Sequence, residues 1–163
     1  MADETTPAAE LTNEQKRENV IRLAFGGDRA RYDEFCRVVW DAVPDDTAVV
    51  LRGSAVTGMR WKDGAPFDSE GPGTSDLDLT MVGDEVIGLF KATGFFVPAI
   101  HSRPVSEDDP EIAPDLIPLR ERLMEMVGRP VNIQASREMV MYLRGEVLGQ
   151  PYLVLFDKKA HQE

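Results

Sequence analysis

Two short groups of residues in this sequence have the side chains and the spacing to bind a phosphorylated ligand with a divalent cation. Gly53 and Ser54 directly follow residues 47–51 (TAVVL), a β-branched apolar run that is typical of a central strand. A turn of this kind can approach a phosphate closely, because glycine has no side chain and serine can donate a hydrogen bond. Asp76 and Asp78 lie downstream and are two residues apart.

The two aspartates belong to residues 76–82 (DLDLTMV), in which polar and apolar side chains alternate. Alternation predicts a strand, so both carboxylates project from one face and the leucines and the methionine from the other. Aspartate is disfavoured in strands, and neighbouring carboxylates repel each other. Mg²⁺ is the usual ion where carboxylates and phosphates share a coordination shell. Alone, a Gly-Ser pair is more often a plain turn, and Asp-x-Asp a solvated strand face; their combination favours the site.

The elements that must position these groups alternate between strands and helices. Helical patterns begin after Thr12 and Asp28, and further ones follow Asp84, cover 116–127 and follow Ser136. Strand patterns cover 47–51, 76–82, 131–135 and 152–156, while Pro98 makes residues 95–100 an edge strand or a packed loop. This order predicts an α/β (α+β) fold with a mixed central sheet of about four or five strands flanked by helices.

The amino-acid composition excludes several classes of protein. The chain has 163 residues, one cysteine and a net charge of −11, from 18 basic and 29 acidic residues. One cysteine excludes an internal disulfide and a zinc site made of cysteines. The acidic balance and the scattered basic residues argue against duplex nucleic acid as a partner. Residues 1–10 lack an apolar signal segment, so we expect a cytoplasmic location and no membrane association.

Residues 52–54 (RGS), followed by residues 75–79 (SDLDL), resemble the signature of the nucleotidyltransferase fold. DNA polymerase beta, kanamycin nucleotidyltransferase and the minimal nucleotidyltransferases share that fold. The resemblance spans roughly residues 30–157, over which the predicted element order also agrees. It implies a mixed central sheet and transfer of a nucleoside monophosphate from a nucleoside triphosphate, such as ATP, to a hydroxyl or other acceptor with Mg²⁺.

The resemblance also implies roles for individual residues. Gly53 and Ser54 would contact the phosphates, and Asp76 and Asp78 would be the metal ligands. Arg60 and Lys62 lie shortly after the Gly-Ser pair and could reach a triphosphate, although exposed basic residues of this kind are more often solvated.

The chain departs from the family pattern at the third carboxylate. Asn132 stands at the corresponding position of the predicted strand 131–135, and an amide carries no charge and cannot act as a base. Three interpretations follow. Catalysis is weakened, another carboxylate such as Asp157 substitutes, or the chain is a catalytically degenerate module that binds nucleotide or a protein partner. His101 and His161, which have no partner pattern, are expected at the surface.

The predicted domain organisation is a disordered tail at 1–11 and one domain at 12–163, with an inserted loop at 55–75. This insert is longer than the spacer of the minimal members, and Trp61 and Phe67 indicate that it is ordered. The expected acceptor is a small molecule or a protein hydroxyl, because the acidic charge makes a polynucleotide less favourable, although an RNA end held locally stays open. The larger family members carry a helical acceptor domain, for which we expect no room in this chain. A homodimer, through the helix at 116–127 or the N-terminal helix, could supply the missing wall.

Overall fold

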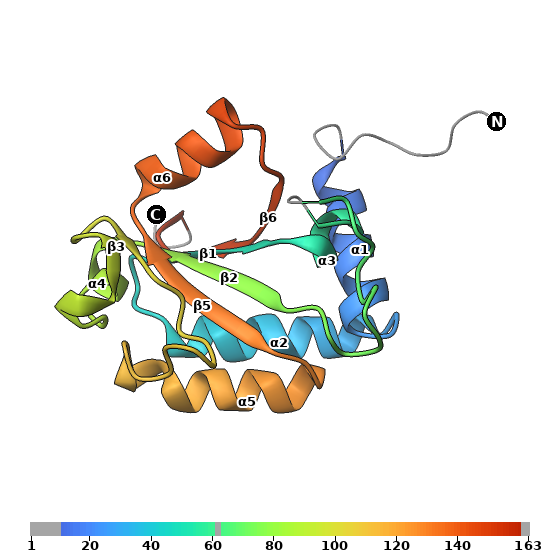
Figure 1. Ribbon diagram of the computed structural model, residues 1–163, viewed down its shortest axis with the longest axis horizontal. Coiled ribbons are helices and arrows are strands. Elements are labelled where there is room, and N and C mark those ends of the chain that lie inside the picture. The colour runs from blue at the N-terminus through green and yellow to red at the C-terminus, as the bar shows by residue number, and fades with distance from the viewer. Residues whose placement is uncertain (1–10, 61–62, 161–163) are drawn as a thin grey trace.

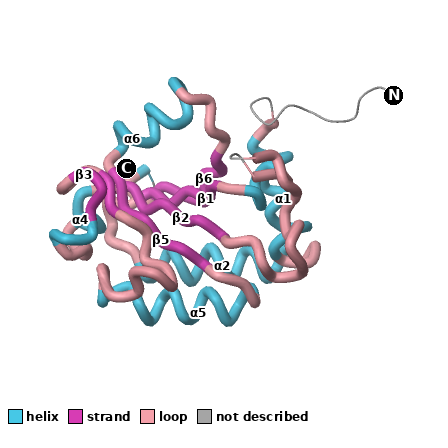
Figure 2. Tube along the Cα trace, viewed as in Figure 1, coloured by secondary structure: helices cyan, strands magenta, loops and turns pink. Residues whose placement is uncertain are grey.

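A six-stranded mixed sheet forms the centre of the computed structural model, which describes residues 11–60 and 63–160 (Figures 1 and 2). The strand order is β3-β4-β5-β2-β1-β6. The strands are β1 (Ala48–Arg52), β2 (Leu77–Val82), β3 (Phe95–Val97), β4 (His101–Ser102), β5 (Val131–Ser136) and β6 (Tyr152–Asp157). The mixed α/β class is therefore confirmed.

The sheet has more strands than the sequence predicted. The strand beyond the predicted four or five is β4, and β3 lies in the segment predicted as an edge strand or a packed loop. The two contain two and three residues, and they form the edge beside β5. Segments this short carry no readable alternation, so the periodicity of the sequence could not define them. The predicted edge position of residues 95–100 is confirmed for β3.

The three strands that carry the Gly-Ser and Asp-x-Asp groups and Asn132 are neighbours, as the sequence predicted. β1 pairs with β2 antiparallel, and β2 pairs with β5 parallel. On its other side β1 pairs antiparallel with β6, with a register shift between Val49 and Val50. β1 and β2 are thus interior strands, in agreement with the apolar run of β1.

Two long helices, α2 (Arg29–Ala42) and α5 (Ile117–Val127), pack beneath one face of the sheet (Figure 1). Their buried side chains meet the apolar faces of the central strands in one core, and these side chains include Phe35, Val39, Leu123, Leu79 and Ile133. Each such side chain contributes roughly 1.5–3 kcal/mol on burial. This face is therefore structural and leaves the opposite, polar face for function.

The remaining helices lie around the ends of the strands. They are α1 (Asn13–Ala24), α3 (Ser54–Thr57), α4 (Asp84–Ile87) and α6 (Glu138–Tyr142), with a π-helical turn, η4 (Leu143–Val147), after α6 and short 3-10 turns η2 (Ala92–Gly94) and η3 (Pro114–Leu116). Thr12 forms the predicted capping box with Gln15, and Asp28 caps α2. In the part of the chain that is described, no helix combines the length and the apolarity that a bilayer crossing needs.

Two predicted caps are wrong. The N-cap of α4 is Gly83, so Asp84 is the first residue of that helix and not its cap. Ser136 was expected to begin the last helix, but Arg137 is the N-cap of α6 and makes no capping bond through its side chain. The Ser136 hydroxyl bonds Nδ1 of His101 instead, because residue 136 is still part of β5 and faces β4. This contact joins the sheet edge to the polar face described below.

Candidate active site

The candidate site is built on a row of three side chains across three strands. In the sheet register Arg52 of β1 is opposite Asp78 of β2, and Asp78 is opposite Asn132 of β5. The alternation of each strand directs these side chains to the polar face, away from the core. The row therefore follows directly from the sequence pattern and the strand pairing.

Asn132 holds the two carboxylates together. Its Nδ2 donates to Oδ2 of Asp76 at 2.8 Å and to Oδ1 of Asp78 at 3.1 Å. The two carboxylate oxygens thus point at the same atom, Nδ2 of Asn132. A cation shared by two carboxylates would hold their oxygens close together in the same way. The expectation that Asn132 shares a face with both aspartates and is aimed at the same point is met by this geometry.

Gly53 brings the main chain against the same carboxylates. Its φ of 99° lies in the left-handed region, and a Cβ at this position would lie 3.2 Å from Oδ2 of Asp78. Both the backbone conformation and the close approach therefore require glycine. Ser54, which is buried, begins α3 immediately afterwards, and the first N–H groups of a helix have no acceptor within it.

Contacts with α1 and at its own C-terminal end hold the short helix α3 in place. Asn19 Nδ2 donates to the Val56 carbonyl at 2.9 Å, and Gly58 adopts a left-handed conformation that ends α3 with a bond to the Ser54 carbonyl. These contacts fix the direction in which the Gly53–Ser54 turn faces the cleft.

A cavity of about 360 Å³ opens over this arrangement. Gly53, Ser54, Asp76 and Asp78 line it, and so do side chains of the insert and of the segment that leads into β6, among them Thr57, Met59, Arg60, Ser69, Glu70, Thr74, Ser75, Gln150 and Pro151. A volume of this size suits a small-molecule ligand. Five of the residues predicted from sequence, Arg60 included, thus line a single cleft.

Burial raises the pKa of the Asp78 carboxyl, and the charge of Asp76 acts in the same direction. The Asn132 amide and the guanidinium groups of Arg52 and Arg144 oppose that rise. A buried carboxylate beside a second carboxylate gains from any added positive charge. The two carboxylates therefore favour a bound cation. Without one, the positive charges that act on Asp78 are those of Arg52 and Arg144.

The insert forms an ordered wall of the cleft. Arg129 donates to both carboxylate oxygens of Asp68, at 2.7 and 3.1 Å, and its guanidinium lies 4.5 Å from the centre of the Phe67 ring. Asp68 also accepts from the Ser75 and Gly73 amides, which ties the two ends of this loop together. The predicted order of the insert is confirmed at Phe67, whereas Trp61 lies outside the described residues.

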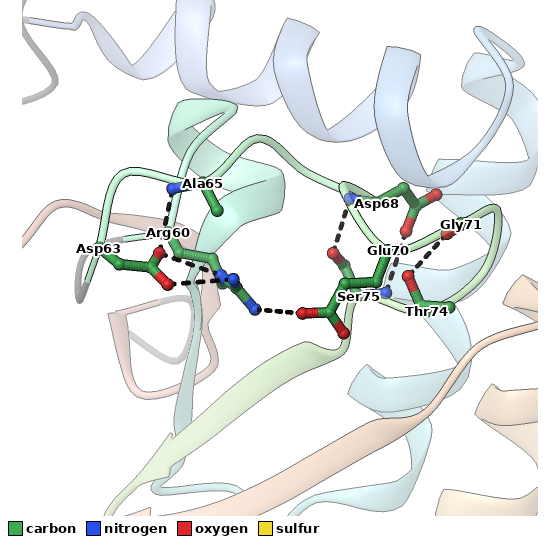
Figure 3. Close-up of polar contacts among 8 residues, drawn as sticks. All are labelled: Arg60, Asp63, Ala65, Asp68, Glu70, Gly71, Thr74 and Ser75. Atoms are coloured by element: carbon green, nitrogen blue, oxygen red, sulfur yellow. Dashed lines mark hydrogen bonds and ion pairs between the residues drawn. The ribbon is translucent and has the colours of Figure 1, made fainter.

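The Arg60 side chain lies between two acidic side chains of the insert, Asp63 and Glu70 (Figure 3). Its guanidinium bonds Asp63 at 3.0 and 3.2 Å and reaches Glu70 at 3.5 Å. Arg60 lines the cleft, as its proposed phosphate contact requires, but acidic side chains already engage it. Lys62, the other basic residue considered for the phosphates, lies outside the described residues.

One of the three alternatives, substitution by Asp157, is not supported, and the expectation for His101 is wrong. Asp157 pairs in register with Ala48, at the end of β1 opposite the Gly53 turn, and caps the backbone of Lys159 and Ala160, so it does not substitute for the third carboxylate. His101 was expected at the surface, but it is 9% exposed. It is buried because the polar face beneath α6 and η4 supplies partners for both ring nitrogens.

Sequence reasoning missed much of the cleft wall. Ser69, Glu70, Thr74 and Ser75 belong to the insert and reach the cleft through the loop geometry that Asp68 fixes. No periodicity marks such positions. Arg144, whose charge acts on Asp78, carried no signal beyond its place in a helical pattern.

Within residues 11–60 and 63–160, no group of three or more histidine, cysteine, aspartate or glutamate side chains is arranged to hold a metal ion. The possible metal ligands of the site are the carboxylate oxygens of Asp76 and Asp78, which both point at Nδ2 of Asn132, and the Asn132 amide oxygen once that amide is rotated. That set fits a single hard cation, with phosphate and water oxygens completing its shell. It does not supply a charged ligand for a second ion.

Comparison of the chain with models of protein families, with curated proteins and with solved structures finds no match.

Proposed function

We propose that the cleft binds a nucleoside triphosphate with Mg²⁺ and transfers its nucleoside monophosphate to a hydroxyl of a small-molecule or protein acceptor. The bond between the α-phosphorus and the bridging oxygen breaks, pyrophosphate leaves, and the acceptor oxygen bonds the α-phosphorus as its proton passes to solvent. Supply of both triphosphate and Mg²⁺ accords with the cytoplasmic location expected from the sequence.

One observation carries this proposal: the two oxygens that converge beside the Gly53–Ser54 turn. Asp76 and Asp78 direct one oxygen each at the Asn132 amide, and the turn approaches Asp78 so closely that a side chain at position 53 would contact it. A phosphate on the turn would therefore lie next to the point that a carboxylate-bound cation occupies. The nucleotidyltransferase resemblance of the same residues agrees with this reading.

Each residue of the site has a role that its position supports. Asp76 and Asp78 would hold the cation, and rotation of the Asn132 side-chain amide would offer its oxygen in place of its nitrogen. Ser54 can donate its hydroxyl to a phosphate oxygen. When bound, Mg²⁺ neutralises the phosphates and stabilises the charge that develops during in-line displacement.

Calorimetric titration of the four common nucleoside triphosphates, with and without Mg²⁺, tests the binding step. We expect binding to require the cation and to be lost when Asp76 and Asp78 are both replaced by asparagine, because the variant removes two charges from the metal site. Asp33→Asn with Asp41→Asn, two exposed positions of α2, is the matched control for net charge. Cation-dependent binding that survives in the Asp76/Asp78 variant would show that these are not metal ligands.

A second candidate function is nucleotide binding without transfer, and the neutral Asn132 favours it. The strand position beside Asp76 and Asp78 carries an amide, and the other carboxylate that lines the cleft, Glu70, is paired with Arg60. The acceptor hydroxyl then lacks a base whose assistance is typically worth about 10²–10⁴-fold. Release of pyrophosphate across a panel of acceptors separates the two candidates. A degenerate module would bind triphosphate and release none.

A further inference from the structure

The polar face of the sheet continues beyond Asp78 into a second group of charged side chains. Arg52 Nε donates to the Thr80 hydroxyl at 3.1 Å, and its Nη2 donates to Oε1 of Gln134 at 3.1 Å. Arg144 of η4 donates from Nη2 to Nε2 of His101 at 2.9 Å. We call Arg52, Arg144 and His101 the arginine cluster.

The arginine cluster has an excess of positive charge. Arg52 and Arg144 are both cations, and Asp78 is the carboxylate whose charge acts on both of them. Burial and the two arginines lower the pKa of His101 to about 4, so its ring is neutral at pH 7. Two guanidinium groups thus share one carboxylate, which is itself engaged by Asn132. A buried excess of positive charge favours an anion at this place.

Arg144 also has an N–H group with no acceptor. Its Nη1 is buried without a hydrogen-bond partner, as are single nitrogens of Arg103, Arg120 and Arg129. The other three each have an oxygen partner: Asp109, the Val131 carbonyl and Asp68. Among the described contacts of Arg144, the partner is a neutral imidazole nitrogen only. Leaving such a donor unpaired is unfavourable, and an oxyanion would supply the missing acceptor.

The arginine cluster adjoins the candidate active site. Arg52 lines the cleft together with Asp78, and Gln150 and Pro151 of the segment that follows η4 line it as well. Figure 1 shows α6 and the chain after it standing over the face of the sheet opposite α2 and α5. A ligand in the cleft can therefore contact Arg52, the member of the arginine cluster that lines it, and the charges of Arg52 and Arg144 both act on the neighbouring Asp78.

We propose that the arginine cluster binds a carboxylate or phosphate group of the acceptor, so that the acceptor is an anionic small molecule. Arginine suits this task because its planar group can donate two parallel hydrogen bonds to one oxyanion. The assignment to the acceptor rests on the proposed function, whereas oxyanion binding itself does not.

The first experiment measures oxyanion binding without Mg²⁺ or nucleotide. Inorganic phosphate and acetate are titrated into the protein in separate arms, and the His101 ring resonances are followed by NMR. We expect the chemical shifts of the His101 ring to change when the protein is saturated with at least one of the two anions. The anion with the higher affinity shows whether the site prefers a phosphate or a carboxylate group. Arg144→Gln should weaken binding about tenfold or more, because it removes a charge and the fork of donors.

Two further variants keep this test decisive. Arg122→Gln removes one charge from the exposed side of α5 and should leave anion binding unchanged. Arg144→Lys retains the charge but not the fork, and it should bind with intermediate affinity even if Arg144→Gln does not fold. Anion binding that is equal in wild type, Arg144→Lys and Arg144→Gln, or absent from wild type, would overturn the proposal.

The second experiment repeats the titration with saturating Mg²⁺ and nucleoside triphosphate. We expect the anion still to bind, because the acceptor and the nucleotide must occupy the protein together. Displacement of the anion by nucleotide would assign the arginine cluster to the triphosphate and overturn the acceptor assignment. Should no nucleotide bind, the proposed function fails, while the first experiment still decides whether the oxyanion site exists.

Discussion

Asn132 is an amide at the point where two carboxylates meet, and this single residue determines the charge of the candidate site. Its two hydrogen bonds let Asp76 and Asp78 lie close together without a cation. A carboxylate there would instead add a third negative charge to the two already present. If the site binds Mg²⁺ as we propose, the residue exchanges strength of metal binding for stability of the metal-free protein.

Asn132→Asp tests this exchange. Without Mg²⁺ we expect the free energy of unfolding to fall by about 1–3 kcal/mol, because two hydrogen bonds are lost and a like charge is added. With Mg²⁺ the variant should recover that stability, since three carboxylates bind the ion more tightly than two. Chemical denaturation with and without Mg²⁺ measures both effects. Asn13→Asp, the same change at an exposed helix position, is the control, and an equal response to Mg²⁺ in both variants would contradict the prediction.

His101 makes stability depend on pH. Its pKa falls from an ordinary 6.5 to about 4 because burial and the nearby arginines disfavour the charged ring. The unfolded chain therefore binds the proton more readily, so the stabilising contribution is fully present above pH 6.5 and is lost as pH falls toward 4. His101→Gln should reduce the loss of stability between pH 7.5 and pH 5 by about 1–2 kcal/mol. Urea denaturation at the two pH values measures this, and an unchanged loss would place the titrating group elsewhere.

At the scale of elements, the ion pair between Asp68 and Arg129 sets the position of the insert, which forms one wall of the cleft. Asp68 and Arg129 are both largely buried, and together with Ser75 they join the insert to the start of β2. The same loop carries Glu70, which forms an ion pair with Arg60 (Figure 3). The shape of the cleft therefore depends on a residue that does not line it.

Asp68→Asn should lower the free energy of unfolding at pH 7 by about 1–3 kcal/mol, because it leaves the Arg129 charge buried and unpaired. Arg129 lowers the pKa of Asp68 from 3.8 to about 2. That contribution is present above pH 3.8 and fades as pH falls toward 2, so the difference between wild type and variant should shrink over this range. Denaturation at pH 7 and pH 2.5 measures it. Asp33→Asn, in the exposed pair with Arg29, should cost under about 0.5 kcal/mol, and an equal cost at both positions would contradict the argument.

At the scale of the whole molecule, the central strands could be predicted from sequence, because alternation in 76–82 and apolar runs in 47–51 are local patterns. The row formed by Arg52, Asp78 and Asn132 follows once those strands pair. The cleft wall and the arginine cluster could not be predicted in this way. Glu70 and Arg144 reach the site through loop and π-helical geometry that depends on contacts between distant segments.

The two partners of β1 are made at very different times during synthesis. β2 follows within the next thirty residues or so, whereas β6 ends only at Asp157. If β1 and β2 pair in the interval, the N–H and C=O groups along one edge of β1 stay unpaired, and the side chains of that strand include the apolar run AVVL. An unpaired apolar edge is a template for association with other chains. Release of the chain from the ribosome before Tyr152 should therefore give aggregated rather than soluble protein, as sedimentation of a truncated translation product would show.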